Sequence, residues 1–262
     1  KTPVGVKMST GESAKSNYLR PELIKDLIGE IDGTIVECNT AYGGNRSDSK
    51  SHWVAIRERG FLDVAPVDIM DEEGSMTLPV DGGNVLNENY VGTHFANYPS
   101  YVVLSHFKGH AMAGFGGAIK NISIGFASSM GKKWIHSGGK SKESMWGGEQ
   151  NAFLESMADA AKAVTDYVGR DNMVYINVLN RISIDCDCDG DPAEPDIHDI
   201  GILVSRDPVA IDQAGIDLVS KADGNESLMQ RIAEKNGLHT LEAAEKIGVG
   251  SRKYKLVDLD KE

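Results

Sequence analysis

The N-terminal region alternates short apolar runs with an amphipathic segment, and this alternation constrains the fold more than any other feature. Residues 3–8 (PVGVKM) and 34–38 (TIVEC) predict two strands. Residues 21–31 between them predict a helix, with Pro21 in the first turn, where proline is tolerated. A strand–helix–strand unit of this kind implies two parallel strands joined by a right-handed crossover. The chain is therefore expected to adopt an α/β fold.

Later segments extend this pattern. Strands are predicted at 64–70, 102–104, 174–184, 200–204 and 254–259, and helices at 52–59, 151–168, 208–220, 226–235 and 240–247. Residues 71–89 predict a hairpin or excursion, and 131–148 a polar loop. Asp207 is interpreted as a helix N-cap preceding Pro208. Together these elements predict a largely parallel or mixed sheet flanked by helices, in a single α/β domain spanning residues 1–262.

Composition excludes several classes of partner. The formal net charge of −12 disfavours nucleic acid and anionic membranes, so an anionic ligand needs a local cluster of cations. No apolar run approaches the roughly 20 residues that cross a bilayer. The three cysteines do not form a secreted disulfide framework, which favours a reducing, cytoplasmic compartment.

The richest concentration of reactive residues lies between Val102 and Gly125 (VVLSHFKGHAMAGFGGAIKNISIG). His106, Lys108 and His110 follow a predicted buried strand, at the edge where α/β proteins bind ligands. The glycines after them let backbone N–H groups approach an anion, and a helix beginning at Ala118 would add its partial positive charge. The candidate ligand-binding residues of this stretch are Gly114, Gly116, Gly117, Lys120 and Asn121. The glycine spacing matches neither the Walker loop nor the Rossmann fingerprint.

Polar residues also follow the first two predicted strands. The candidates for cofactor or anion binding there are Lys7, Thr10, Asn39, Thr40 and Arg46. Because parallel strands end at the same edge of a sheet, these loops are expected to line one cleft with His106.

The second unusual segment is DCDCDGD, residues 185–191. Asp185, Asp187 and Asp189, together with Asp196, resemble a calcium-loop spacing, although Pro192 and Pro195 argue against an EF-hand. Cys186 and Cys188 are alternatively two soft metal ligands that a histidine completes, with His106 and His110 as the candidates. Neighbouring carboxylates should raise the thiol pKa values and oppose thiolate formation unless a cation is present. A solvated acidic turn is the third interpretation.

Five motifs in one order resemble the family catalogued as domain of unknown function 362, often labelled uncharacterised iron–sulfur-centre proteins. They are VKMSTGE (6–12), ECNTAYGG (37–44), SHFKGHAMAGFGGAIKN (105–121), DCDCDGD (185–191) and DIGILVSRDPVAIDQA (199–214). The resemblance extends from about Val4 to Leu259 and implies a redox-associated protein. Many members carry a ferredoxin-like insertion after the segment that matches residues 135–137. This chain lacks that insertion. Because a ferredoxin-type cluster takes four cysteine thiolates, three cysteines cannot supply one.

Three functions remain open at this point. The leading hypothesis is a redox-linked enzyme that binds an anionic small molecule or a phosphate-bearing cofactor such as a flavin, with His106 and Lys108 as catalytic residues. The second is a divalent-metal enzyme without a redox cofactor. The third is a non-catalytic binding module for a metal or ligand.

Overall fold

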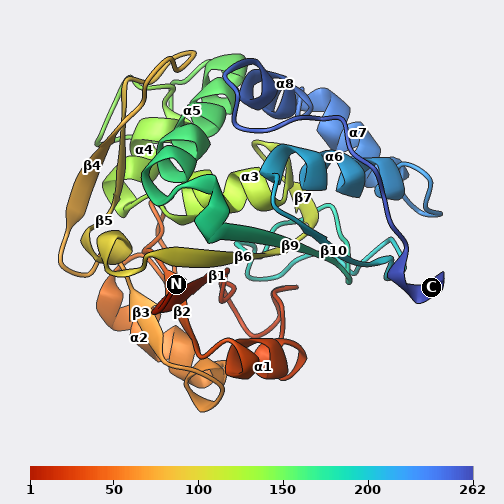
Figure 1. Cartoon of the computed structure of the whole chain (residues 1–262), viewed down its shortest axis with the longest axis horizontal. Coiled ribbons are helices and arrows are strands. Elements are labelled where there is room, and N and C mark those ends of the chain that lie inside the picture. The colour runs from red at the N-terminus through yellow and green to blue at the C-terminus, as the bar shows by residue number, and fades with distance from the viewer. Residues whose placement is uncertain (262) are drawn as a thin grey trace.

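The computed structural model describes residues 1–261 and is organised around a six-stranded sheet in the order β10-β9-β6-β1-β2-β3 (Figure 1). All neighbouring pairs are parallel except β9 and β10. The strands are β1 (Val4–Lys7), β2 (Gly33–Glu37), β3 (Val67–Ile69), β6 (Ser100–His106), β9 (Met173–Leu179) and β10 (Gly201–Ser205). The predicted mixed, largely parallel α/β sheet is thus confirmed.

Successive strands are added on one side of β1 first and then on its other side, so the strand order changes direction at β1. The chain moves outward from β1 to β2 and β3, then returns to the other side of β1 and continues through β6 to β9. Lys7 at the end of β1 is therefore in register with Val36 of β2 and Val103 of β6. Ligands of open α/β sheets bind outside the carboxyl ends of the strands at such a reversal.

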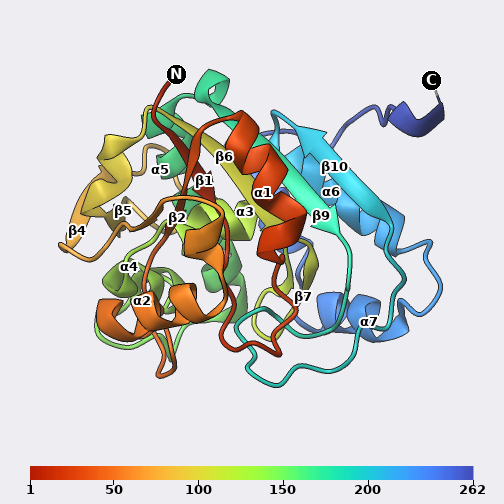
Figure 2. The ribbon, with the colours of Figure 1, turned by 90° about the horizontal axis from the view of Figure 1, so that it is seen from below.

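Helices cover both faces of the sheet. Figures 1 and 2 show α1 (Pro21–Glu30) and α2 (Ser49–Glu58) on one face, and the remaining helices on the other. The second layer comprises α3 (Ala118–Lys120), α4 (Ser129–His136), α5 (Gln150–Val168), α6 (Pro208–Val219), α7 (Glu226–Glu234) and α8 (His239–Lys246). Alternate residues of the strands face opposite layers, which gives two apolar cores: Val6 and Ile35 belong to one, Val36 and Val103 to the other.

Two small antiparallel pairs supplement the sheet. β4 (Ser75–Pro79) pairs with β5 (Glu88–Gly92), which confirms the predicted hairpin in residues 71–89. β7 (Lys108–His110) pairs with β8 (Gly114–Gly116), immediately after β6. Short 3-10 turns occur at Phe61–Asp63, Thr93–Asn97, Arg170–Asn172 and Leu259–Lys261, and a π-helical turn, Asn121–Gly125, follows α3. Over residues 1–261 none of the helices combines the length and apolar character required to cross a membrane.

Three expectations about elements were wrong, and one of them is the strand predicted at 174–184, which ends at Leu179. Residues 131–148 contain the end of α4, where a loop was predicted; the Ser128 hydroxyl caps this helix by accepting a hydrogen bond from the Gly131 N–H. Residues 254–259 form no strand, because this exposed apolar segment pairs with no sheet edge in the described chain. Asp207 does cap α6, accepting from the Val209 and Ala210 N–H groups.

Candidate functional site

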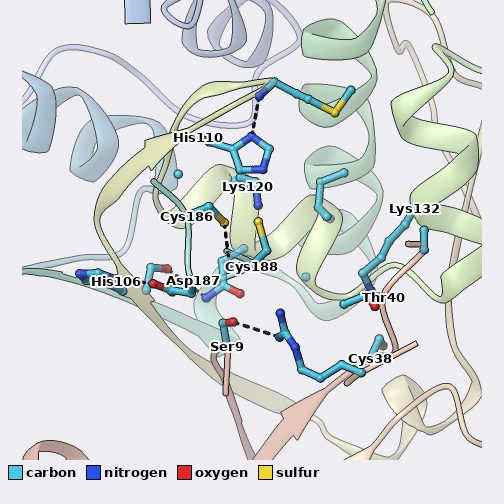
Figure 3. A pocket seen from close by; sticks show the side chains of 18 of the residues that line it. Ser9, Cys38, Thr40, His106, His110, Lys120, Lys132, Cys186, Asp187 and Cys188 are labelled. Atoms are coloured by element: carbon cyan, nitrogen blue, oxygen red, sulfur yellow. Dashed lines mark hydrogen bonds and ion pairs between the residues drawn. The ribbon is translucent and has the colours of Figure 1, made fainter. Parts of the chain in front are cut away.

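A cavity of about 300 Å³ opens where β1, β2 and β6 end (Figure 3). Lys7, Cys38 and His106 reach it from the ends of these three strands. The β7–β8 hairpin, the π-helical turn, α4 and the loop of residues 185–189 complete the wall. The cavity therefore lies at the edge of the sheet where the strand-end loops were predicted to meet.

Most of the sequence-derived candidates line this cavity. They are Lys7, Thr40, Arg46, His106, Lys108, His110, Gly116, Gly117, Lys120, Asn121, Cys186 and Cys188. Thr10, Asn39 and Gly114 do not. The Thr10 hydroxyl donates to Glu37, the Asn39 amide donates to Ser49, and Gly114 packs against the backbone of α7 and Gly237.

A buried ion cluster forms one side of the cavity. The Arg46 guanidinium donates to Glu37 at 2.6 Å and to Glu12 at 3.2 Å. The second Glu37 oxygen lies 3.2 Å from His52 Nε2 and 2.6 Å from the Thr10 hydroxyl. Burial alone would raise the pKa of Glu37, but the charge of Arg46 and the hydrogen bond with His52 lower it well below its usual range. Arg46 is thus neutralised within the protein rather than free for a ligand.

A second ion cluster involves the cysteine loop, residues 183–191, which carries Cys186 and Cys188. Asp187 turns into the protein, where one carboxylate oxygen lies 2.7 Å from His106 Nδ1. The other lies 2.9 Å from Lys108 Nζ, an ion pair without good hydrogen-bond alignment. Lys108 Nζ also donates to the His106 carbonyl at 2.8 Å. Burial alone would raise the pKa of Asp187, but the charges of Lys108 and His106 lower it strongly.

His106 is fully engaged by protein oxygens. Its Nδ1 faces Asp187 and its Nε2 faces the Asn180 carbonyl, both at 2.7 Å. Both ring nitrogens therefore face protein oxygens at hydrogen-bond distance, and neither is directed at a metal site in this arrangement. His106 and Lys108 therefore hold the cysteine loop against β6, while their predicted catalytic role stays a prediction.

The predicted anion site at the helix N-terminus is occupied by the protein itself. Asp212 accepts from the Ala118 N–H at 2.7 Å and from the Ile119 N–H at 2.9 Å. A Cβ at Gly117 would lie 2.3 Å from the Asp212 carboxylate, so glycine is required for this close approach. The N–H groups that follow Gly117 thus bind an internal carboxylate where a ligand anion was expected. Unpaired N–H groups at the start of a helix attract a carboxylate of the protein as they would attract a ligand anion.

Three lysines line the cavity without a carboxylate at ion-pair distance among residues 1–261: Lys7, Lys120 and Lys132. Lys7 donates to the Met8 carbonyl at 2.6 Å and Lys132 to the Ala127 carbonyl at 2.5 Å. Burial lowers the pKa of Lys7 to about 8, although Glu37 partly opposes this effect. Lys120 is half-buried and ends beside the two sulfur atoms (Figure 3).

Cys186, Cys188 and His110 form a cluster in the cavity wall. Their ligand-type atoms lie within 4.8 Å of one another, so the sequence-derived pairing of the thiols with a histidine is present in space. His110 Nδ1 accepts hydrogen bonds from the Met112 and Ala113 N–H groups, at 3.2 and 3.0 Å. A neutral His110 must then carry its proton on Nε2, the nitrogen left to face Cys186.

This tautomer bears directly on the metal hypothesis. A histidine that binds a metal through one nitrogen normally donates an N–H from the other. His110 does the reverse, so metal binding through Nε2 would require an imidazolate. The predicted metal site stays a prediction, and the two thiols are its remaining candidate ligands. The carboxylates of the calcium interpretation do not converge on one site: Asp187 points inward to His106 and Lys108, and Asp196 accepts a hydrogen bond from the Ser227 hydroxyl.

The two thiols differ in character. The Cys188 N–H donates to Cys186 Sγ at 3.3 Å. A hydrogen bond from the Cys188 thiol, aided by Lys120 and His110, lowers the pKa of Cys186 well below its usual value despite burial. The expectation that neighbouring carboxylates would disfavour a thiolate was wrong for Cys186, because Asp187 is neutralised by Lys108 and His106.

Sequence reasoning missed several residues that line the cavity, among them Glu37, Lys132, His136 and Trp146. Glu37 had a signal, since an acidic residue at a buried strand end needs a cation. Lys132 and His136 lie on α4, which was predicted as a loop. Trp146 lies on an exposed loop whose sequence carries no periodic pattern.

The chain belongs to the family described as Domain of unknown function (DUF362), whose family model matches residues 4–217. A search of the curated proteins found no match. Among solved structures, the lactate racemase apoprotein of Thermoanaerobacterium thermosaccharolyticum is similar in fold, with a TM-score of 0.51 and 15% identity over 83% of this chain and 48% of that one. A structural-genomics protein from Thermotoga maritima aligns with a TM-score of 0.39 and 12% identity, over 93% of this chain and 54% of that one. The chain thus spans about half the length of both structures.

Proposed function

We propose that the cavity is the active site of an enzyme that binds a small anionic molecule and acts on it through redox-linked or thiol chemistry. The charge of the cavity wall supports this proposal most strongly. Five lysine and arginine side chains line the cavity, against two carboxylates, Glu37 and Asp187. Both carboxylates are already paired within the protein. The positive charge of Lys7, Lys120 and Lys132 is left for a ligand.

The energetic reasoning is that of buried charge. An ammonium group held away from water costs free energy unless an opposite charge neutralises it. Lys7 and Lys132 are buried, and a backbone carbonyl supplies only a partial negative charge to each. An anion bound in the cavity would supply the opposite charge that these lysines lack. The net charge of the whole chain is −12, so this positive cavity is a local feature.

The volume restricts the ligand further. About 300 Å³ lies at the lower end of the range of small-molecule pockets, roughly 300–1,000 Å³. This favours a small carboxylate or phosphate compound over a dinucleotide. A flavin would have to leave part of its structure outside the cavity.

Isothermal titration with small anions tests the proposal. Phosphate, oxalate and a three-carbon carboxylate are titrated into the protein, into Lys120→Gln, and into Lys140→Gln as a control at an exposed lysine outside the cavity. We expect one of the anions to bind, and binding to weaken at least about tenfold in Lys120→Gln and with added salt. Equal affinities in the two variants would contradict the proposal, as would the absence of any binding.

A further inference from the structure

We propose that Cys186 is the covalent nucleophile of the cavity, held as a thiolate for attack on an electrophilic carbon of a small anionic compound. This inference deepens the proposed function and rests on it for the anionic character of the substrate. It does not require a metal, a flavin or an iron–sulfur cluster.

The hydrogen-bond donors around Cys186 carry the argument. His110 faces it with the protonated Nε2, because the Met112 and Ala113 N–H groups occupy Nδ1. The Cys188 N–H donates to Cys186 Sγ at 3.3 Å, and the ligand-type atoms of His110, Cys186 and Cys188 lie within 4.8 Å of one another. Lys120 supplies positive charge from the cavity side (Figure 3). Donors and a cation gathered around one sulfur favour the thiolate, which is the nucleophilic form.

The backbone fixes the geometry of this pair. The Gly109 N–H donates to the Ser183 carbonyl at 2.8 Å, which ties the β7 strand to the cysteine loop. A Cβ at Gly109 would lie 2.1 Å from the Ile184 carbonyl oxygen, so no other residue permits this approach. Asp187, between the two cysteines, is locked by Lys108 and His106. His110 and Cys186 are therefore positioned by contacts on both sides of each residue.

Cys38 provides an internal comparison within the same cavity. It is buried and lines the cavity, but its thiol donates to the Phe126 carbonyl at 3.3 Å. Burial and the charge of Asp71 raise its pKa to about 12. Cys38 is thus a thiol in a site that the same small reagents can enter, and it should react much more slowly than Cys186.

The proposed step conserves atoms and electrons without an external oxidant. The Cys186 sulfur donates an electron pair to a carbonyl carbon that neighbours the anionic group. The carbon–oxygen π pair moves to the oxygen, which takes one proton from the Lys120 ammonium, and a thiohemiacetal results. Lys120 regains its proton from solvent.

Alkylation measures this nucleophile directly. The full-length protein is treated with iodoacetate or iodoacetamide, and the modification of each cysteine is followed by peptide mass spectrometry. In the reaction the sulfur–carbon bond forms, the carbon–iodine bond breaks, and iodide leaves with the electron pair. We expect iodoacetate to modify Cys186 roughly ten- to a thousandfold faster than Cys38, since the cationic cavity concentrates the anionic reagent near the thiolate.

Two substitutions of His110 separate its structural and chemical contributions. His110→Asn keeps an acceptor near the position of Nδ1 but removes the donor to Cys186. His110→Gln places an amide N–H near the position of Nε2. We expect Cys186 alkylation to slow at least about tenfold in the asparagine variant and less in the glutamine variant. Circular dichroism of both variants verifies that they are folded.

The outcomes distinguish the two proposals. Modification of Cys186 no faster than that of Cys38, or an equal loss in both His110 variants when both are folded, would overturn the assignment of the nucleophile even if an anion binds. Rapid modification of Cys186 by iodoacetamide, without any advantage for iodoacetate, would support the nucleophile and contradict the anionic substrate.

Discussion

Replacing Glu37 with glutamine should destabilise the fold strongly, because this carboxylate balances a buried arginine. The Glu37 side chain is 4% exposed and accepts contacts from Arg46 at 2.6 Å, Thr10 at 2.6 Å and His52 at 3.2 Å. A glutamine has one acceptor oxygen, so its NH₂ group would face a donor wherever it turned. Arg46, also 4% exposed, would keep only Glu12 as a counter-charge.

The expected loss is about 3–5 kcal/mol, the range for breaking a buried ion pair by removing one partner. It would be measured as the change in the free energy of unfolding in urea, followed by circular dichroism. Asp171→Asn is the matched control, because the Asp171–Arg206 ion pair is 2.7 Å long but exposed to solvent. That variant should change stability little.

The pH dependence gives the same experiment a second test. The pKa of Glu37 is lowered in the folded protein, so its contribution is complete above its unfolded value of about 4.3 and is lost as the pH falls through the folded value. The stability difference between the two proteins should therefore be constant near neutral pH and shrink in acid. Equal destabilisation by Glu37→Gln and Asp171→Asn at pH 7 would refute the reasoning.

Three further predictions concern the cavity and its supports. Because burial lowers the pKa of Lys7 to about 8, anion affinity in calorimetry should fall as the pH rises above that value; Lys7→Met should bind more weakly with a smaller pH dependence, since burial also lowers the pKa of Lys132, and an unchanged profile would remove Lys7 from the site. Burial raises the pKa of Asp212 to about 6, so its ionisation should cost up to roughly 3 kcal/mol between pH 4 and 6, and Asp212→Asn should lose this slope of unfolding free energy against pH. Gly109→Ala should destabilise by roughly 1–3 kcal/mol in urea and slow the alkylation of Cys186, whereas Gly29→Ala, with open space around its Cβ, should not; similar behaviour of the two would contradict the close packing.

The sequence predicted the architecture well because the parallel sheet depends on local signals. Apolar strands, a helix that starts at Pro21 and an Asp207 cap each require only neighbouring residues to be recognised. Given parallel strands, the meeting of Lys7, Cys38 and His106 at one edge follows from topology. The wrong strand at 254–259 shows the limit of such signals, since an apolar run becomes a strand only if a sheet edge is available.

The side-chain partners within the site could not be predicted in the same way. Whether Asp187 repels the neighbouring thiols or turns toward Lys108 depends on a contact far apart in sequence. Asp212 occupies the N–H groups after Gly117 from a distant helix, which no local pattern reveals. The tautomer of His110 is likewise fixed by the turn that follows it.

The most direct test of the central claim is to locate an anion in the cavity. Crystals of the protein soaked in selenate would be measured at the selenium absorption edge, where the anomalous signal marks each bound anion. The account predicts a selenate site in contact with Lys120 and within reach of Lys7 and Lys132, absent in Lys120→Gln crystals. Selenate found only at exposed surface lysines, with the cavity holding water in both proteins, would contradict it.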